Sequence, residues 1–290
     1  MSLRLQMLQV ARLAPRVLGE SSDLVRAFAS SRFLTAGGAV DRAGCVDLYY
    51  TIFALALRDA LGISGEPPGL RAWLEGFGPG DGLDFIHLGA LARCRAAAGM
   101  QAGSGLLLAR IGEFRTPDGG FHETRGAKHG HAYGCFVALG AYQDAGEEMP
   151  EPLRMVQCLK LLETPDGAWG NVRGMRAGTV PATAAAVTLL HELGLPLAES
   201  PAAWLLSRQH ESGGWLAAPG APVPDLLSTA TALHALACMD RALDGSRRER
   251  CLDFVDSLWS AEGGFHGHWA DDDLDAEYTF YGLLALGHLA

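Results

Sequence analysis

The run Thr116-Pro117-Asp118-Gly119-Gly120-Phe121 combines a polar residue, a glycine-centred turn and an aromatic ring. Related runs recur along the chain: TPDGAW at 164–169, HESGGW at 210–215 and SAEGGF at 260–265. Two weaker copies end at Ala39 and Leu83, so the closing residues of the six turns lie 44, 38, 48, 46 and 50 positions apart. A recurrence with this period predicts a repeated supersecondary unit whose copies bury their apolar faces on one another.

An apolar helix is predicted after each turn. The predicted helices begin near Asp47, Asp84, His131, Val180, Asp225 and Asp275. Aspartate is typical of a helix start because its carboxylate accepts hydrogen bonds from the free backbone N–H groups. The stretch from Thr229 to Ala237 is apolar on nearly every face except for His234 and small hydroxyls, which indicates a buried helix.

Amphipathic helices are predicted between the apolar ones. They cover about 22–33, 68–75, 104–114, 152–163, 202–209 and 247–259. Six alternations of a buried and an amphipathic helix predict two concentric rings in one domain spanning residues 1–290, an all-α (α/α)6 toroid. If the inner helices run parallel, all their N-termini surround one mouth of a central cavity.

The composition restricts the class of protein. The chain has 290 residues, of which 49% are hydrophobic and 19% charged, as in a core-rich globular protein. A net charge of −10 argues against nucleic acid or an anionic membrane as the main partner. Six cysteines without a CxxC pair predict reduced thiols and a cytoplasmic protein. Neither a secretory signal nor an apolar run long enough to span a membrane is recognised.

The four later turns, each followed by a helix of small residues, resemble the repeats of protein prenyltransferase β subunits and of squalene or terpene cyclases. The resemblance runs from about residue 33 to residue 290. It implies a toroid with an isoprenoid in an aromatic-lined central cavity. Prenyltransferases of this family add a zinc ion and a basic diphosphate-binding cluster, whereas the cyclases protonate an alkene with an Asp-x-Asp-Asp acid.

The residues that carry these two chemistries are largely replaced in this chain. Where the prenyltransferases have Asp-x-Cys, the chain has Asp225-Leu226-Leu227, and Tyr278 stands near the position of the zinc-binding histidine. Because zinc needs about four donors, with Cys or His prominent, no zinc site is predicted. The basic Gly-Arg-Pro-x-Lys segment reads AAPGA at 217–221, and the cyclase acid keeps only Asp225.

The starts of the last two apolar helices contain the candidate catalytic groups. Asp225 matches a catalytic aspartate of the resemblance and Asp275 stands beside a ligand position, so both are predicted as acid–base groups or metal ligands. Glu277 and Tyr278 follow in the first turn after Asp275. The alternative is that both aspartates only cap their helices.

An acidic run precedes the last helix. Asp271, Asp272 and Asp273, with Asp275 and Glu277, place five carboxylates within seven positions. They are candidate oxygen ligands for Mg²⁺, or they include one carboxyl group whose pKa is raised by crowding. The alternative is a solvated loop followed by a helix cap.

Basic residues before the third apolar helix are the candidates for holding an anionic head group: Arg125, Lys128, His129 and His131. A soft metal site formed by His122, His129, His131 and Cys135 is an alternative, but the spacing matches no compact zinc motif. Asp47, at the mouth, is a further candidate ligand contact.

Aromatic residues on the apolar helices and on the turns before them are predicted to line the cavity. They are Tyr49, Tyr50, Tyr133, Trp169, Trp215, Phe280 and Tyr281. Aromatic walls suit an apolar chain and stabilise a carbocation through their quadrupoles. The alternative is that these rings simply fill the centre of the barrel.

The sequence therefore predicts a prenyltransferase-like or terpenoid cyclase-like enzyme that acts on a prenyl chain without the zinc site of the family. A non-catalytic binding scaffold and a carboxylate-based carbohydrate enzyme are the alternatives, because a fold does not specify an activity. A helical partner subunit or a homodimer is compatible with the pattern.

Overall fold

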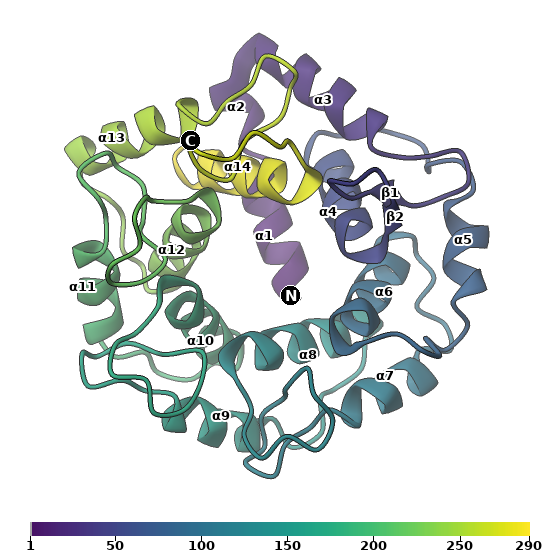
Figure 1. Ribbon diagram of the computed structural model, residues 1–290, viewed down its shortest axis with the longest axis horizontal. Helices are drawn as coiled ribbons and strands as arrows, with labels where there is room; N and C mark the ends of the chain where they lie inside the picture. Colours follow the sequence, from purple (N-terminus) through teal and green to yellow (C-terminus); the bar gives the residue numbers. More distant parts are fainter. Residues whose placement is uncertain (1) are drawn as a thin grey trace.

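The computed structural model describes residues 2–290 and contains a closed ring of inner helices (Figure 1). These are α4 (Leu48–Ala60), α6 (Phe85–Ala97), α8 (Ala132–Ala145), α10 (Val180–Glu192), α12 (Leu226–Cys238) and α14 (Ala276–His288). Each inner helix packs on the next one along the chain, and α14 packs back on α4. The ring therefore closes between the last helix and the first repeat.

Shorter helices surround this ring (Figure 1). They are α3 (Ser22–Ser31), α5 (Leu70–Gly76), α7 (Gly105–Gly112), α9 (Pro152–Leu161), α11 (Ser200–Ser207) and α13 (Gly245–Asp256). In α13, for example, Cys251, Phe254 and Val255 are buried, whereas most of its charged residues are solvent-exposed. The alternation confirms the predicted (α/α)6 toroid.

Every inner helix begins after a residue whose side chain accepts a hydrogen bond from the backbone N–H three positions later. These N-caps are Asp47, Asp84, His131, Thr179, Asp225 and Asp275. Such a cap contributes about 1 kcal/mol. The helix starts predicted at the aspartates and at His131 are confirmed, and the fourth helix is capped by Thr179.

The inner helices run in the same direction. The start of α6 meets the start of α4 where His87 Nε2 lies 2.9 Å from Asp47 Oδ2. At the other end of the ring, His234 of α12 contacts His288 of α14. All six N-termini consequently surround one opening, as the sequence predicts.

The glycine turns bring the inner and outer helices together. Gly213 has φ +100°, and a Cβ there would overlap the carbonyl of Arg250 in α13. After this turn, the Trp215 N–H donates to Thr229 Oγ1 of α12 (3.0 Å) and its indole N–H donates to Leu205 O of α11 (2.8 Å). The repeated turn therefore holds an inner helix and an outer helix together through hydrogen bonds and close backbone packing.

Trp169 and Trp215 do not line the cavity, contrary to the prediction. Both rings are buried between an inner and an outer helix, and the indole of Trp169 donates to Leu159 O of α9 (3.0 Å). Both residues, which close their turns, therefore face the space between the two rings rather than the centre. Their role is in packing.

A helix that the sequence analysis did not predict closes one end of the barrel. Helix α1 (Leu3–Ala11) crosses the middle of the ring in Figure 1 and packs on α14, α4 and α8. Its start is held by Ser2 Oγ donating to Asp144 Oδ1 (2.9 Å), and Gln6 contacts Glu192. Because Asp144 and Glu192 lie at the ends of α8 and α10, α1 forms a floor opposite the mouth.

Two small segments complete the fold. Helix α2 (Pro15–Leu18) and the 3-10 helix Gly19–Ser21 connect α1 to α3. Strands β1 (Ala39–Val40) and β2 (Val46–Asp47) pair antiparallel just before α4 and present their loop at the mouth. Within residues 2–290, no helix is both long and apolar enough to cross a membrane.

Candidate active site

A cavity of about 440 Å³ lies inside the ring, in the size range of small-molecule sites. Its wall comes from α1, α4, α8, α10, α12 and α14: aromatic Tyr49, Tyr133, Phe136 and Tyr281, and small residues of α10 such as Ala182, Ala184 and Ala185. Met7 of α1 contributes to the lining from the floor, and Asn171 and Thr179 contribute near the mouth. The wall is therefore mostly apolar and aromatic.

The structure places only some of the predicted aromatic residues on this wall. Tyr49, Tyr133 and Tyr281 line it. Phe280 is buried beside Phe53 and Tyr281, with ring centroids 5.9 and 6.2 Å away, and supports the wall from behind. Tyr50 lies outside the cavity, against the edge of Tyr49. The lining rings come from α4, α8 and α14, which the ring closure brings together.

Glu277 stands in the first turn of α14 beside these tyrosines. The Tyr49 hydroxyl donates to Glu277 Oε1 at 2.5 Å. Burial raises the pKa of Glu277 to about 7, even though the hydrogen bond from Tyr49 lowers it. Burial, followed by nearby groups that include Glu277, raises the pKa of Tyr281 well above 10. Near neutral pH, a substantial fraction of Glu277 is thus a neutral carboxylic acid at the edge of an apolar cavity.

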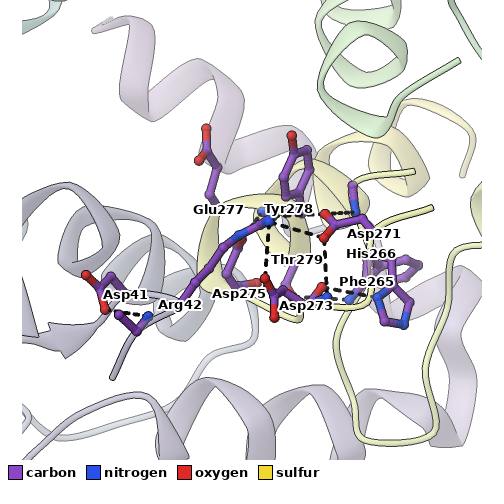
Figure 2. Close-up of polar contacts among 12 residues, drawn as sticks. Asp41, Arg42, Phe265, His266, Asp271, Asp273, Asp275, Glu277, Tyr278 and Thr279 are labelled. Atoms are coloured by element: carbon purple, nitrogen blue, oxygen red, sulfur yellow. Dashed lines mark hydrogen bonds and ion pairs between the residues drawn. The ribbon is translucent and has the colours of Figure 1, made fainter. Parts of the chain in front are cut away.

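The other carboxylates of the last repeat are bound by Arg42, which the sequence analysis did not single out. Arg42 lies in the β1–β2 loop and approaches Asp275 (2.6 Å), Asp271 (2.9 Å) and Asp273 (3.6 Å). Figure 2 shows this cluster, with Glu277 pointing away from Asp271 and Asp273. Burial alone raises the pKa of Asp271, but the hydrogen bonds from Arg42 and the Asp273 N–H together lower it.

This arrangement bears on the predicted magnesium ligands Asp271, Asp272 and Asp273. The Arg42 guanidinium already supplies the positive charge between Asp271 and Asp273, so Mg²⁺ would have to displace it. Asp272 is exposed. Asp275, only 2% exposed, also caps α14 by accepting the Tyr278 N–H at 2.7 Å. The donor set does not fit a resident magnesium ion.

Asp225 and Tyr278 likewise do not form a zinc site. Asp225 accepts from the N–H and the hydroxyl of Ser228 (2.7 and 2.8 Å), and burial raises its pKa. Leu227 lines the cavity instead of offering a thiolate. The Tyr278 ring lies 5.3 Å from the guanidinium carbon of Arg42, and burial raises the pKa of Tyr278 to about 12. One buried carboxyl and a neutral phenol do not suit zinc.

The predicted head-group residues of the third repeat do not converge. Lys128 and His129 are exposed, and His129 Nδ1 lies 3.4 Å from Asp118. Arg125 points outward and pairs with Glu113 at 3.1 Å. These residues form no common anion site in the structure.

His131 is a buried helix cap. Its Nδ1 accepts the Gly134 N–H (2.8 Å), and its Nε2 pairs with Glu123. His122, Glu123 and His131 lie close enough for a metal ion. A metal on Nε2, however, would leave the neutral ring without a nitrogen for its own proton unless the cap bond broke.

Asp47 is paired with His87, a residue that the sequence analysis did not single out. Its Oδ1 accepts the Tyr50 N–H (2.9 Å), and its Oδ2 contacts His87, which also contacts Asp84 at 2.9 Å. Burial alone lowers the pKa of His87, but the hydrogen bonds that its protonated ring donates to the carboxylates of Asp47 and Asp84 together raise it. This bridge ties the first two inner helices together at the mouth.

Comparisons with known proteins agree with this architecture. Residues 183–289 match the family model of the prenyltransferase alpha-alpha toroid domain. No curated protein sequence matches the chain.

Solved structures match over nearly the whole chain. A variant of type II terpene cyclase MstE from Scytonema, in complex with geranylgeranyl dihydroxybenzoate as substrate, is 14% identical, with a TM-score of 0.62 over 98% of this chain and 97% of that one. A second variant, in complex with the product merosterolic acid A, has 14% identity and a TM-score of 0.63 over 95% and 97%. A protein from Actinoplanes has 16% identity and a TM-score of 0.61 over 93% and 97%. The repeats, the closed ring and these matches show that the chain has the α-α toroid fold of these proteins, and its residues 183–289 match the prenyltransferase toroid domain.

Proposed function

We propose that the protein is a terpenoid cyclase-like enzyme that holds an isoprenoid chain in the central cavity and starts its cyclisation by protonating a carbon–carbon double bond. The observation that carries the proposal is the Glu277 carboxyl group, which is hydrogen-bonded to Tyr49 of the aromatic, apolar cavity wall and has its pKa raised to about 7 by burial. The Scytonema cyclase, which binds a geranylgeranyl substrate in the same fold, supports it.

The wall of the cavity favours a hydrocarbon ligand over a sugar. Tyr49, Tyr133, Phe136 and Tyr281 present rings, and α10 presents mainly alanines. A carbohydrate needs many directed hydrogen bonds, which such a wall does not offer. Aromatic faces instead attract a positive charge, so they stabilise the carbocation that follows protonation.

Glu277 meets the requirements for the acid. Its carboxyl proton passes to one alkene carbon, the π electrons form the new C–H bond, and the other alkene carbon becomes cationic. Tyr49 donates to Oε1 and stabilises the carboxylate that remains. Asp275 is less suited to this role because Arg42 binds its carboxylate at 2.6 Å.

The pairing of Arg42 and Arg125 with carboxylates also fits protonation of an alkene better than prenyl transfer from a diphosphate. Arg42 is committed to three carboxylates, and Arg125 is paired with Glu113 outside the cavity. A reaction that begins by ionising a diphosphate needs cations or a metal at the departing group, whereas protonation of an alkene does not.

The test is product analysis with three probes: geranylgeraniol, geranylgeranyl diphosphate and geranylgeranyl dihydroxybenzoate. We expect a cyclised isomer of unchanged mass in H₂O and the incorporation of one deuterium in D₂O, with no release of diphosphate. Glu277→Gln should lower turnover by at least about 10²-fold, whereas the exposed control Glu163→Gln should not. Tight binding of a probe without turnover would instead support the scaffold alternative.

We also infer a cytoplasmic location, because the cysteines are free and four of the six are buried. Light scattering after size exclusion tests whether the protein acts alone, as a homodimer or with a helical partner.

A further inference from the structure

A buried histidine faces the cavity near its floor. His234 of α12 lines the cavity and is only 6% exposed, and its Nε2 has no hydrogen-bond partner among residues 2–290. A buried polar atom without a partner is costly and is a frequent mark of a functional group. The neighbouring hydroxyls do not satisfy it, since Thr231 donates to Leu227 O and Thr188 donates to Ala184 O.

The other ring nitrogen of His234 contacts a second histidine outside the cavity. Its Nδ1 lies 3.1 Å from Nε2 of His288, the last residue of α14. His288 lines a second hollow of about 360 Å³ between the ends of α12 and α14 and the start of α13. Asp240 and Arg241, in the wall of this hollow, are exposed, so the hollow is open to solvent. Two imidazole rings in series therefore connect the cavity to the outside.

Both rings are neutral at physiological pH. Burial, together with the nearby His191 of α10, lowers the pKa of His234 to about 4. Burial and the neighbouring His234 lower the pKa of His288 to about 3. The charged residues in the wall of the outer hollow are Asp240, Arg241 and Arg248. A neutral imidazole carries one lone pair, which accepts a proton from a carbocation, a far stronger acid than an imidazolium.

We propose that His234 is the base that ends the cyclisation and that His288 conducts the proton to solvent. This inference rests on the proposed cyclase function and assigns a second catalytic group to the same cavity. Glu277 and His288 are separated by 11 positions of α14, about 16 Å along the helix, so the acid and the proton exit lie at opposite ends of the cavity.

The proton that the cation loses passes through both histidine rings. A C–H bond next to the cationic carbon breaks, and its electrons form the product double bond. Nε2 of His234 takes the proton, Nδ1–H of His234 passes its proton to Nε2 of His288, and Nδ1–H of His288 releases a proton to water in the outer hollow. Glu277 regains its proton from solvent at the mouth. The two tautomers reset when water enters the emptied cavity.

The test compares His234→Ala, His288→Gln and the exposed control His129→Gln with the wild type on geranylgeranyl dihydroxybenzoate and geranylgeraniol. For His234→Ala we expect probe affinity within about threefold of wild type, with at least about half of the product diverted to alkene isomers or to an alcohol formed by water capture. His288→Gln should keep the first turnover and slow later ones about tenfold or more. The control should match the wild type.

Three outcomes would overturn these statements separately. An active His234→Ala with the wild-type product would refute the relay and leave the proposed function intact. A wild type that converts no probe would refute the proposed function. Nitrogen-15 NMR of the histidine rings in wild-type protein needs no variant to fold: we expect both rings to be neutral at pH 6, and a protonated His234 at that pH would refute its role as base.

Discussion

Replacing Glu277 by glutamine should stabilise the protein at high pH but not at low pH. The carboxyl group has its pKa raised from 4.5 to about 7 by burial. Because one pKa unit corresponds to about 1.4 kcal/mol, holding the ionised carboxylate in the fold costs about 3 kcal/mol. Glutamine has a similar shape, keeps an oxygen for the Tyr49 hydroxyl and carries no charge.

The direction of the pH dependence follows from the raised pKa. The folded state binds the Glu277 proton more tightly than the unfolded chain does, so its stabilising contribution is complete below about pH 4.5 and is lost as the pH rises through about 7. Wild type and Glu277→Gln should therefore unfold alike near pH 4.5. Above about pH 8.5 the variant should be more stable by about 3 kcal/mol, or roughly 6 °C in Tm.

The assay is thermal unfolding followed by circular dichroism at both pH values, with the exposed Glu163→Gln as the control for loss of a glutamate. Other titrating groups are the same in all three proteins and cancel in the differences. An equal Tm shift at both pH values, or destabilisation above pH 8, would show that Glu277 is ionised at no cost in the fold. The acid role proposed for it would then lose its physical basis.

Three further substitutions test other parts of the structure. Arg42→Ala leaves the carboxylate of Asp275 buried without its cation and should lower the free energy of unfolding, measured in urea, by about 3 kcal/mol or more. Arg42→Lys keeps a positive charge and should lower it less. Gly213→Ala forces a Cβ at φ +100° onto a carbonyl of α13 and should lower the free energy of unfolding by about 2 kcal/mol or more. The control Gly220→Ala, at φ +84° with open space around the new methyl group, should show only the smaller loss from backbone strain. Gly287→Ala places a methyl group against a carbonyl of α1; proteolysis should then cleave α1 faster than in wild type, and unchanged cleavage would contradict its role as the floor.

The repeated architecture could be predicted because its signals are local. A cap such as Asp225 acts on the N–H of Ser228, three residues later, and the composition of each helix decides whether it is buried. The turn glycines are local as well, since the positive φ of Gly213 is a property of that turn. These features recur in every repeat, so each copy strengthened the same conclusion.

The candidate site was only partly predictable because neighbouring residues in the sequence have different surroundings in space. Asp275 and Glu277 are two positions apart, yet Asp275 is bound by Arg42 while Glu277 is half-buried against Tyr49. The position of Trp215 after its turn predicted a place in the cavity wall, but its side chain packs between the inner and outer rings of helices. No local pattern distinguishes these cases.

The sequence by itself determined the class of fold, the number of repeats and the positions at which the inner helices begin. Only the tertiary structure decided which carboxyl group has its pKa raised beside the cavity, that α1 closes the floor and that His234 meets His288 there. The physical reason is that capping and hydrophobic periodicity depend on residues a few positions apart, whereas burial and pairing depend on segments that the closed ring brings together from opposite ends of the chain.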